Sequence, residues 1–224
     1  MAYYPIFVEM KDRPCLVIGG GREAQRKVNG LLAAGARITV VAPKLTRSLQ
    51  QLLAAGDIEC LQREYEEGDV EGYEVVMVAT DDGAINAEVA AEGKRRRVWV
   101  NAADDPTNCD FILPAVIRRG AITLAASTGG ASPALARRLR EELEAYLTEE
   151  MPALADLLRE VRGDLGSRGI KPDAELWQEA IDEQLRVLLA QRKYRQAKAR
   201  LLRSLGAEEL VEELVGAESG GVTA

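Results

Sequence analysis

The stretch Cys15-Leu-Val-Ile-Gly-Gly-Gly-Arg-Glu-Ala24 decides the predicted fold. A short apolar run ends in three glycines, and apolar residues then recur at helical spacing from Ala24. The pattern G-x-G-x-x-A from Gly19 is typical of dinucleotide-binding turns, because small residues permit a tight turn, close approach to a pyrophosphate and close helix packing. A glycine-rich turn that serves packing alone is the alternative. We predict a dinucleotide site at the helix N-terminus that includes Gly19, Gly20, Gly21, Arg22 and Glu23.

Strands and helices alternate on both sides of this turn. The predicted strands are Cys15–Ile18, Arg37–Ala42, Ile58–Gln62, Glu74–Ala79 and Val98–Asn101. Helical patterns begin at Ala24, at Thr46 and at Ala84. Repeated strand–helix–strand units predict a parallel sheet with crossover helices, so we expect residues 1–113 to form a Rossmann-type α/β domain.

The pattern changes after residue 113. Phe111–Ile117 and Ala121–Ser127 are two adjacent strands, expected to pair antiparallel as a small extension of the sheet, and Ser132-Pro133 then begins a helix to Leu147. These elements make a second segment, residues 114–149. The leucine-rich remainder, 150–216, is expected to be all-helical, with Asp173–Arg192 as one helix and Gly163–Pro172 as its main loop. Residues 217–224 are expected to be disordered.

The chain of 224 residues contains no histidine. This excludes histidine-based triads and the usual zinc and non-haem iron sites, so we predict no metal site and expect carboxylates or other groups to move protons. The net charge of −7 argues against a nucleic-acid-coating protein. Three cysteines without CxxC spacing fit a reducing compartment. Without a signal-peptide pattern or a long apolar run, we expect a cytoplasmic protein that binds no membrane.

The ends of the predicted strands supply further candidates, because ligands of such sheets lie outside the carboxyl ends of the strands. After the second strand, Ala42 and Pro43 should border the cofactor, but no carboxylate follows to bind a ribose hydroxyl. Residue chemistry therefore leaves NAD and NADP open. After the fourth strand, Thr80 and Asp81 should border the cofactor, although an aspartate there is equally suited to capping the next helix.

The fifth strand ends in Asn101, and Asp104 follows it. Without histidine, Asp104 is the best-placed candidate for a general base in the same crevice. The alternative is an Asx-turn before the next proline.

A second small-residue loop, Ser127–Pro133, leads into the next helix. Its backbone N–H groups are suited to a carboxylate or phosphate, although a plain capped turn needs no ligand. A local basic cluster flanks it, which is either a polyanion site or a solvated face. Its members are Arg118, Arg119, Arg137, Arg138 and Arg140.

Several motifs in order resemble the precorrin-2 dehydrogenase family, whose relatives include the dehydrogenase–ferrochelatase module of siroheme synthase. Matching motifs occur throughout residues 4–147, whereas the helical remainder shows only a general similarity. The matching residues are Tyr4-Pro-Ile-Phe-Val8, Cys15–Gly21 with Ala24 and Lys27, Leu32, Gly35-Ala36, Ala79-Thr-Asp-Asp82 with Asn86, Val100–Asp104, Phe111–Pro114, and Ser127–Pro133 with Leu135-Ala-Arg137.

The resemblance implies NAD-dependent oxidation of precorrin-2 to sirohydrochlorin, on the way to siroheme or cobalamin, with metal insertion as an open second activity. It implies a homodimer formed through 114–149, catalysis by Asp104, and NAD as cofactor. The substrate, an octacarboxylate, gives the basic cluster a partner, and we predict that Asn101, Ser127, Thr128, Gly129 and Arg137 bind it.

Two departures from fused relatives stand out. Thr128 occupies a position that is a phosphorylatable serine in some of them, so regulation there stays open. About 75 residues after Leu147 are too few for a methyltransferase domain, so we expect none. A non-catalytic NAD(H)-sensing module is the alternative function, although such modules typically keep an acid after the second strand.

Overall fold

The structure is a computed structural model that describes residues 3–103 and 105–216. Its contacts divide the chain into two compact units, Met1–Leu113 and Pro114–Ala224. The predicted disordered tail, 217–224, lies outside the described residues. None of the helices in the described part is long and apolar enough to cross a membrane.

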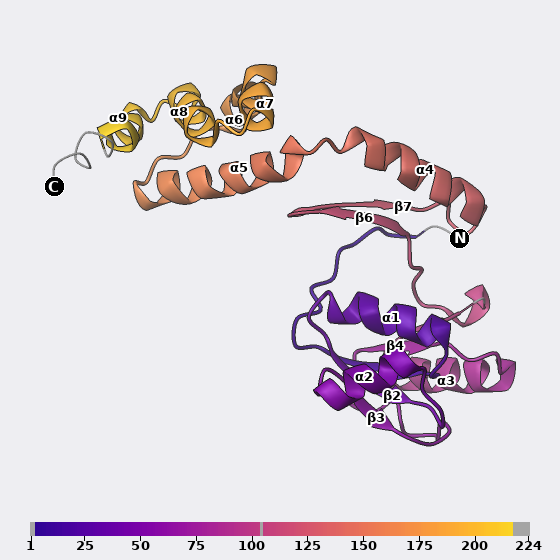
Figure 1. Cartoon of the computed structure of the whole chain (residues 1–224). Helices are drawn as coiled ribbons and strands as arrows, with labels where there is room; N and C mark the ends of the chain where they lie inside the picture. Colours follow the sequence, from indigo (N-terminus) through magenta and orange to yellow (C-terminus); the bar gives the residue numbers. More distant parts are fainter. Residues whose placement is uncertain (1–2, 104, 217–224) are drawn as a thin grey trace. The chain divides into compact units, whose positions relative to one another are not determined.

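The first unit is built on a five-stranded parallel sheet in the order β3-β2-β1-β4-β5 (Figure 1). This confirms the Rossmann-type α/β prediction. The strands are β1 (Pro14–Ile18), β2 (Arg37–Val41), β3 (Glu59–Leu61), β4 (Val75–Val78) and β5 (Trp99–Ala102). The connecting helices are α1 (Arg22–Leu32), α2 (Arg47–Ala55) and α3 (Gly83–Arg96), followed by a 3-10 turn, η1 (Pro106–Asn108).

Alternating side chains of β1 pack into two hydrophobic cores on opposite faces of this sheet. Cys15 and Val17 pack with residues of α1 and α2, whereas Leu16 and Ile18 pack with Val89 of α3. A strand buried on both faces reads as a continuous apolar run, which is what residues 15–18 show. The chain changes faces between β1 and β4, the switch point at which ligands of such sheets bind.

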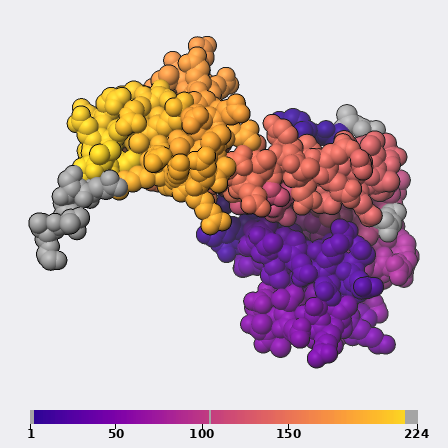
Figure 2. Space-filling model, turned by 45° about the horizontal axis from the view of Figure 1, so that its top comes forward, coloured from indigo at the N-terminus to yellow at the C-terminus, as the bar shows by residue number. Residues whose placement is uncertain are grey.

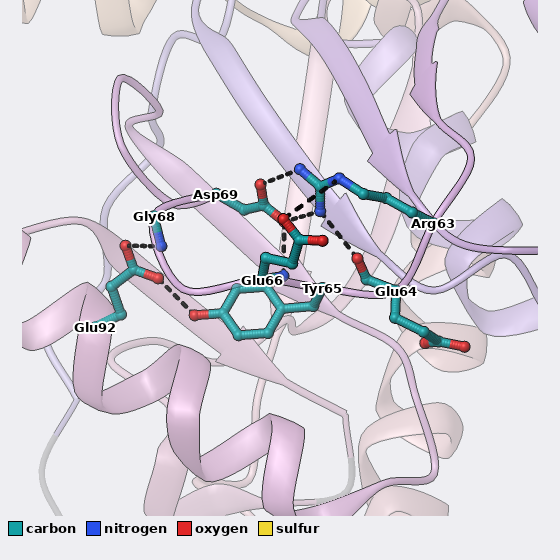
Figure 3. Close-up of polar contacts among 7 residues, drawn as sticks. All are labelled: Arg63, Glu64, Tyr65, Glu66, Gly68, Asp69 and Glu92. Carbon is teal, nitrogen blue, oxygen red and sulfur yellow. Dashed lines mark hydrogen bonds and ion pairs between the residues drawn. The ribbon is translucent and has the colours of Figure 1, made fainter.

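A loop with no regular helix, residues 62–74, connects β3 to β4. Its anchor is Glu92 of α3, a carboxylate that is only 1% exposed. Glu92 accepts hydrogen bonds from the Tyr65 hydroxyl (2.5 Å), the Gly68 backbone (3.1 Å) and the Arg96 guanidinium (2.6 Å) (Figure 3). Arg63 and Asp69 close the loop with a second, bidentate ion pair. Polar contacts therefore replace a crossover helix here.

The second unit begins with an antiparallel pair, β6 (Ala115–Arg119) and β7 (Ile122–Ala126), on which α4 (Pro133–Tyr146) packs. The predicted extension of the main sheet is wrong, because β6 and β7 form a two-stranded sheet of their own. Strand β6 begins at Ala115 and not at the predicted Phe111, because Phe111 packs on the core of the first unit.

The remaining helices, coloured orange to yellow in Figure 2, pack around one leucine-rich core. They are α5 (Glu150–Ser167), α6 (Ala174–Ala180), α7 (Glu183–Ala190), α8 (Tyr194–Ser204) and α9 (Glu208–Gly216). Two boundaries differ from the prediction. The α5 helix continues to Ser167 because Leu165 is a core residue. The predicted helix 173–192 is divided because the Asp182 carboxylate caps the Leu185 N–H at 2.7 Å and starts α7.

Replacing Glu92 by alanine should lower the free energy of unfolding by about 3 kcal/mol, because the buried partners lose their acceptor. Urea titration measures this. Burial raises the pKa of the Glu92 carboxyl, but the hydrogen bonds from Tyr65, Gly68 and Arg96 outweigh it and hold the pKa below its ordinary value. The stabilisation is therefore present above the ordinary carboxyl pKa and lost as the pH falls through the lowered one. Glu92→Gln should flatten this acid dependence.

The matched control is Glu67→Ala, which removes an ion pair to Arg95 in which both side chains are more than half exposed. Its effect should stay within about 0.5 kcal/mol. Equal losses from the two variants would contradict the anchoring role of Glu92.

Candidate functional site

The glycine turn between β1 and α1 is held by direct main-chain contact with two neighbouring loops. A Cβ atom added at Gly19 would lie 2.3 Å from the carbonyl oxygen of Ala79, and one at Gly20 would lie 1.9 Å from that of Lys44. Gly19 also has φ of +115°, which disfavours any side chain. The structure thus brings three loops together at the carboxyl edge of the sheet: 19–21, 42–46 and 79–82.

Gly21 differs from the two glycines before it. A Cβ atom placed there would meet no atom of the described residues within 4 Å. Gly21 is the N-cap of α1 and supplies no side-chain cap, so its helix N-terminus is suited to an anion. Ala24, the third small residue of the pattern, is fully buried against the sheet. Space at Gly21 beside an uncapped helix end fits a pyrophosphate.

The other predicted cofactor residues lie around this turn. Ala42 faces Gly20, since its Cβ would be 3.0 Å from one added there. Pro43, Arg22 and Asp81 are exposed. Glu23 is also exposed and pairs with Arg26 at 2.9 Å. No contact among the described residues assigns these exposed side chains to a ligand, so their role in cofactor binding stays a prediction.

The loop after β4 contains a capped helix start. The Asp82 carboxylate accepts hydrogen bonds from the N–H groups of Ala84 (2.9 Å) and Ile85 (3.3 Å). The Thr80 hydroxyl accepts one from the Asp82 N–H at 3.0 Å. Of the two aspartates, Asp82 is therefore the cap, which leaves Asp81 unengaged by the helix.

The end of β5 carries a buried polar pair. The Lys27 ammonium donates to the side-chain oxygen of Asn101 at 2.8 Å, and both residues are more than nine-tenths buried. The Asn101 amide nitrogen donates in turn to the carbonyl of Phe111 at 2.9 Å. A buried ammonium requires such acceptors. Asn101 is thus committed to holding the segment that follows β5, and direct substrate contact by it stays a prediction.

Further contacts stabilise the same segment. The Cys109 thiol lies 3.1 Å from the carbonyl of Ala102 and 3.2 Å from that of Asp105, and burial raises the pKa of the thiol, so it stays protonated. The Asp105 carboxylate accepts from Thr107 and Asn108, which holds its pKa below its usual range. Asp104, the predicted catalytic residue, lies outside the described residues.

The loop between β7 and α4 is closed by its own hydrogen bonds. The Thr128 hydroxyl oxygen lies 3.1 Å from both the N–H and the carbonyl of Ser132. The Ser127 hydroxyl accepts from the Gly129 N–H, and the Ser132 hydroxyl caps Leu135, as predicted. These hydrogen bonds determine the shape of the loop. Binding of a substrate by Ser127, Thr128 and Gly129 stays a prediction.

The structure separates the five clustered arginines into two groups. Arg119 donates to the carbonyl of Leu147, while Arg138 and Arg140 form ion pairs one helical turn apart with Glu142 and Glu144. Arg118 and Arg137 are exposed and make no hydrogen bond or ion pair with the described residues. Arg118 and Arg137 are therefore the members available to an anionic ligand.

Two polar residues on buried helix faces are absent from the predicted site residues. Lys27 lies on the apolar stripe of α1 with Ala24 and Val28, and Asn86 lies on that of α3 with Val89. A polar residue at a core position is the signal that identifies both. Elsewhere in the described chain, no cluster of three or more His, Cys, Asp and Glu side chains could hold a metal ion.

Comparison with known proteins places these features in a family. Residues 6–115 match a family described as putative NAD(P)-binding, and residues 119–146 match the central part of sirohaem biosynthesis proteins. The solved structure of SirC, a precorrin-2 dehydrogenase, superposes with a TM-score of 0.71 at 32% identity, covering 87% of this chain and 98% of that one.

Siroheme synthases from several bacteria are similar to this chain in amino-acid sequence. That of Photorhabdus laumondii is 38% identical over 98% of this chain and 48% of its own length. That of Methylococcus capsulatus is 43% identical over 72% of this chain and 34% of its own length. This chain thus spans about half the length, or less, of these siroheme synthases.

Alanine substitutions at Gly20 and Gly21 should affect different properties: the first should lower stability, and the second should weaken cofactor binding. Gly20→Ala should unfold or strongly destabilise the first unit, because its Cβ has no room beside the Lys44 carbonyl. Gly21→Ala should cost at most about 1 kcal/mol, the difference between glycine and alanine as an N-cap. It should nevertheless weaken NAD(H) binding about tenfold or more, because the methyl group occupies the space at the helix end.

Thermal unfolding and NADH fluorescence measure the two effects. Full NADH affinity in a folded Gly21→Ala protein would show that the turn serves packing alone.

Proposed function

This chain belongs to the precorrin-2 dehydrogenase family, and from that premise we propose that it oxidises precorrin-2 to sirohydrochlorin with NAD as the hydride acceptor. The observation that carries the proposal is the match to a precorrin-2 dehydrogenase over 98% of that chain, combined with open space at Gly21 beside an uncapped helix.

The residues of the first unit fit a dinucleotide. Gly19 and Gly20 hold the turn against the neighbouring loops, Gly21 leaves room for a pyrophosphate, and the N-terminus of α1 favours its charge. Bound NAD supplies a hydride acceptor. NAD rather than NADP is proposed from the family resemblance, since no carboxylate follows β2 to decide between them.

The reaction removes a hydride and a proton from the tetrapyrrole and extends its conjugation. Bound NAD would accept the hydride, so the chain's own residues need to supply a group only for the proton. In a chain without histidine, we assign the proton to Asp104, which follows β5 by two residues in the sequence. The buried Lys27–Asn101 pair supports this assignment, because it stabilises the strand end from which residue 104 follows.

An octacarboxylate substrate requires cationic groups that are not already neutralised. Arg118 and Arg137 meet this requirement among the clustered arginines, because the other three are engaged within the second unit. We propose that these two arginines bind substrate carboxylates together with the 127–129 loop, which precedes the helix that carries Arg137.

We further propose a homodimer formed through α4. Every residue of this helix is at least partly exposed, and its apolar side chains include Leu135 (50% exposed), Leu143 (36%) and Tyr146 (69%). An amphipathic helix with no buried residue is suited to burial against a second copy. A sedimentation mass equal to one chain would contradict this.

The purified protein, mixed with precorrin-2 and NAD, should produce NADH absorbance and the sirohydrochlorin spectrum. Asp104→Asn should lower kcat at least tenfold while NAD affinity changes little, because the side chain acts on the proton and not on the dinucleotide. Asp57→Asn, on the exposed surface after α2, is the matched control and should retain full activity.

Tight NADH binding without turnover of the tetrapyrrole would instead favour a nucleotide-sensing module. Adding Fe²⁺ or Co²⁺ to the same assay, against the spontaneous rate, tests for metal insertion.

Neighbouring arginines on α4 should behave differently toward the substrate. Arg137→Ala should raise the KM for precorrin-2 roughly fivefold, because a free guanidinium that pairs with a carboxylate is lost. Arg138→Ala should change KM less than about twofold, since its charge is already paired with Glu142. Equal KM values for the two variants would remove Arg137 from the substrate site.

A further inference from the structure

Asn86 carries a buried polar atom that has no hydrogen-bond partner among the described residues. The residue is 6% exposed, and its side-chain oxygen makes no hydrogen bond within the described residues. Buried amide oxygens in folded proteins are almost always hydrogen-bonded, because an unsatisfied acceptor loses its water without compensation. Such an acceptor takes either a buried water molecule or a donor from a bound ligand.

The position of Asn86 in α3 is tightly determined. Asn86, Val89, Ala90 and Gly93 form the buried face of the helix, which packs on β4 and β5. A Cβ atom at Gly93 would lie 2.3 Å from a methyl carbon of Val100, so the helix backbone lies directly against β5. The helix therefore cannot rotate to expose the Asn86 amide without losing this close contact.

The amide lies near the edge of the sheet where ligands bind. Asn86 is in the first turns of α3, which begins at Gly83 after the carboxyl end of β4. The helix also contacts η1, the turn that follows β5. Asn86 thus lies beside the carboxyl ends of β4 and β5, on the opposite side of β1 from β2 and β3.

This side of the sheet would receive one half of a dinucleotide. With the pyrophosphate at the glycine turn after β1, the adenosine half would extend over β2, and the nicotinamide half would extend over β4 and β5, given the strand order. The donor that the nicotinamide presents is the N–H of its carboxamide. An amide oxygen is the acceptor that matches it.

We propose that the Asn86 side-chain oxygen accepts a hydrogen bond from the nicotinamide carboxamide of the bound cofactor. The inference rests on the proposed function and adds a residue that orients the reactive ring. An orphan in the apo chain is then satisfied only when the cofactor is bound, so a stability cost in the free protein is exchanged for cofactor affinity.

The test compares Asn86→Leu, which removes the acceptor at similar volume, with wild type by direct binding. The ligands are NAD⁺, its acetylpyridine analogue, which has a methyl group in place of the carboxamide nitrogen, and ADP-ribose, which lacks the ring. Asn86→Leu should bind NAD⁺ about tenfold more weakly, but the other two ligands within about twofold. The melting temperature of the free variant should equal or exceed that of wild type, because the orphan is gone.

Asn29→Leu, the same substitution at an exposed position of α1, is the control and should leave all three affinities unchanged. If Asn86→Leu does not fold, Asn86→Ala should show the same pattern among the ligands. Unchanged NAD⁺ affinity, or an equal loss for NAD⁺ and ADP-ribose, would overturn the inference and assign the oxygen to a water molecule or to packing. Failure of the wild-type protein to bind NAD⁺ would overturn both this inference and the proposed function. A failure to turn over precorrin-2 would count against the proposed function alone.

Discussion

The close approach of three backbone segments at the glycine turn is the constraint on which the rest of the candidate site depends. The turn after β1 admits no side chain at Gly19 or Gly20, because the carbonyls of Ala79 and Lys44 occupy the space. These contacts bring the carboxyl ends of β1, β2 and β4 together and set the direction of α1. Of the three glycines in the turn, Gly21 alone has no atom of the described residues within 4 Å of an added Cβ, so the turn that packs the sheet also leaves one place for a ligand.

Polar groups inside an otherwise apolar unit mark where the fold does more than pack. Glu92 has three donors and anchors a loop, and the Lys27–Asn101 pair stabilises the end of β5. Both carry a charge that would be costly to bury without partners. The Asn86 oxygen lacks such a partner among the described residues. A buried polar group that has its partners is explained by stability, whereas one without them is a candidate for binding water or a ligand.

Local patterns predicted the first unit well because its signals are short-range. Residues 15–24 combine a buried strand, a tight turn and a helix start, each of which depends on neighbours in sequence. The second unit was less predictable. Whether β6 and β7 extend the main sheet or pair alone depends on contacts far apart in sequence, as does the division of residues 173–192 by the Asp182 cap. The arginine cluster showed the same limit, since its pairing with carboxylates separates members that look alike in sequence.

The sequence by itself determined the order of strands and helices, the glycine turn and the absence of histidine, because these follow from residue type and spacing. It also carried enough ordered motifs to indicate the family. Only the tertiary structure decided which glycines serve packing and which leaves space. It also decided which arginines make no ion pair, and that the Asn86 oxygen is buried without a partner, within the described residues. The physical reason is that hydrogen-bond satisfaction and steric room are properties of atoms brought together from distant parts of the chain.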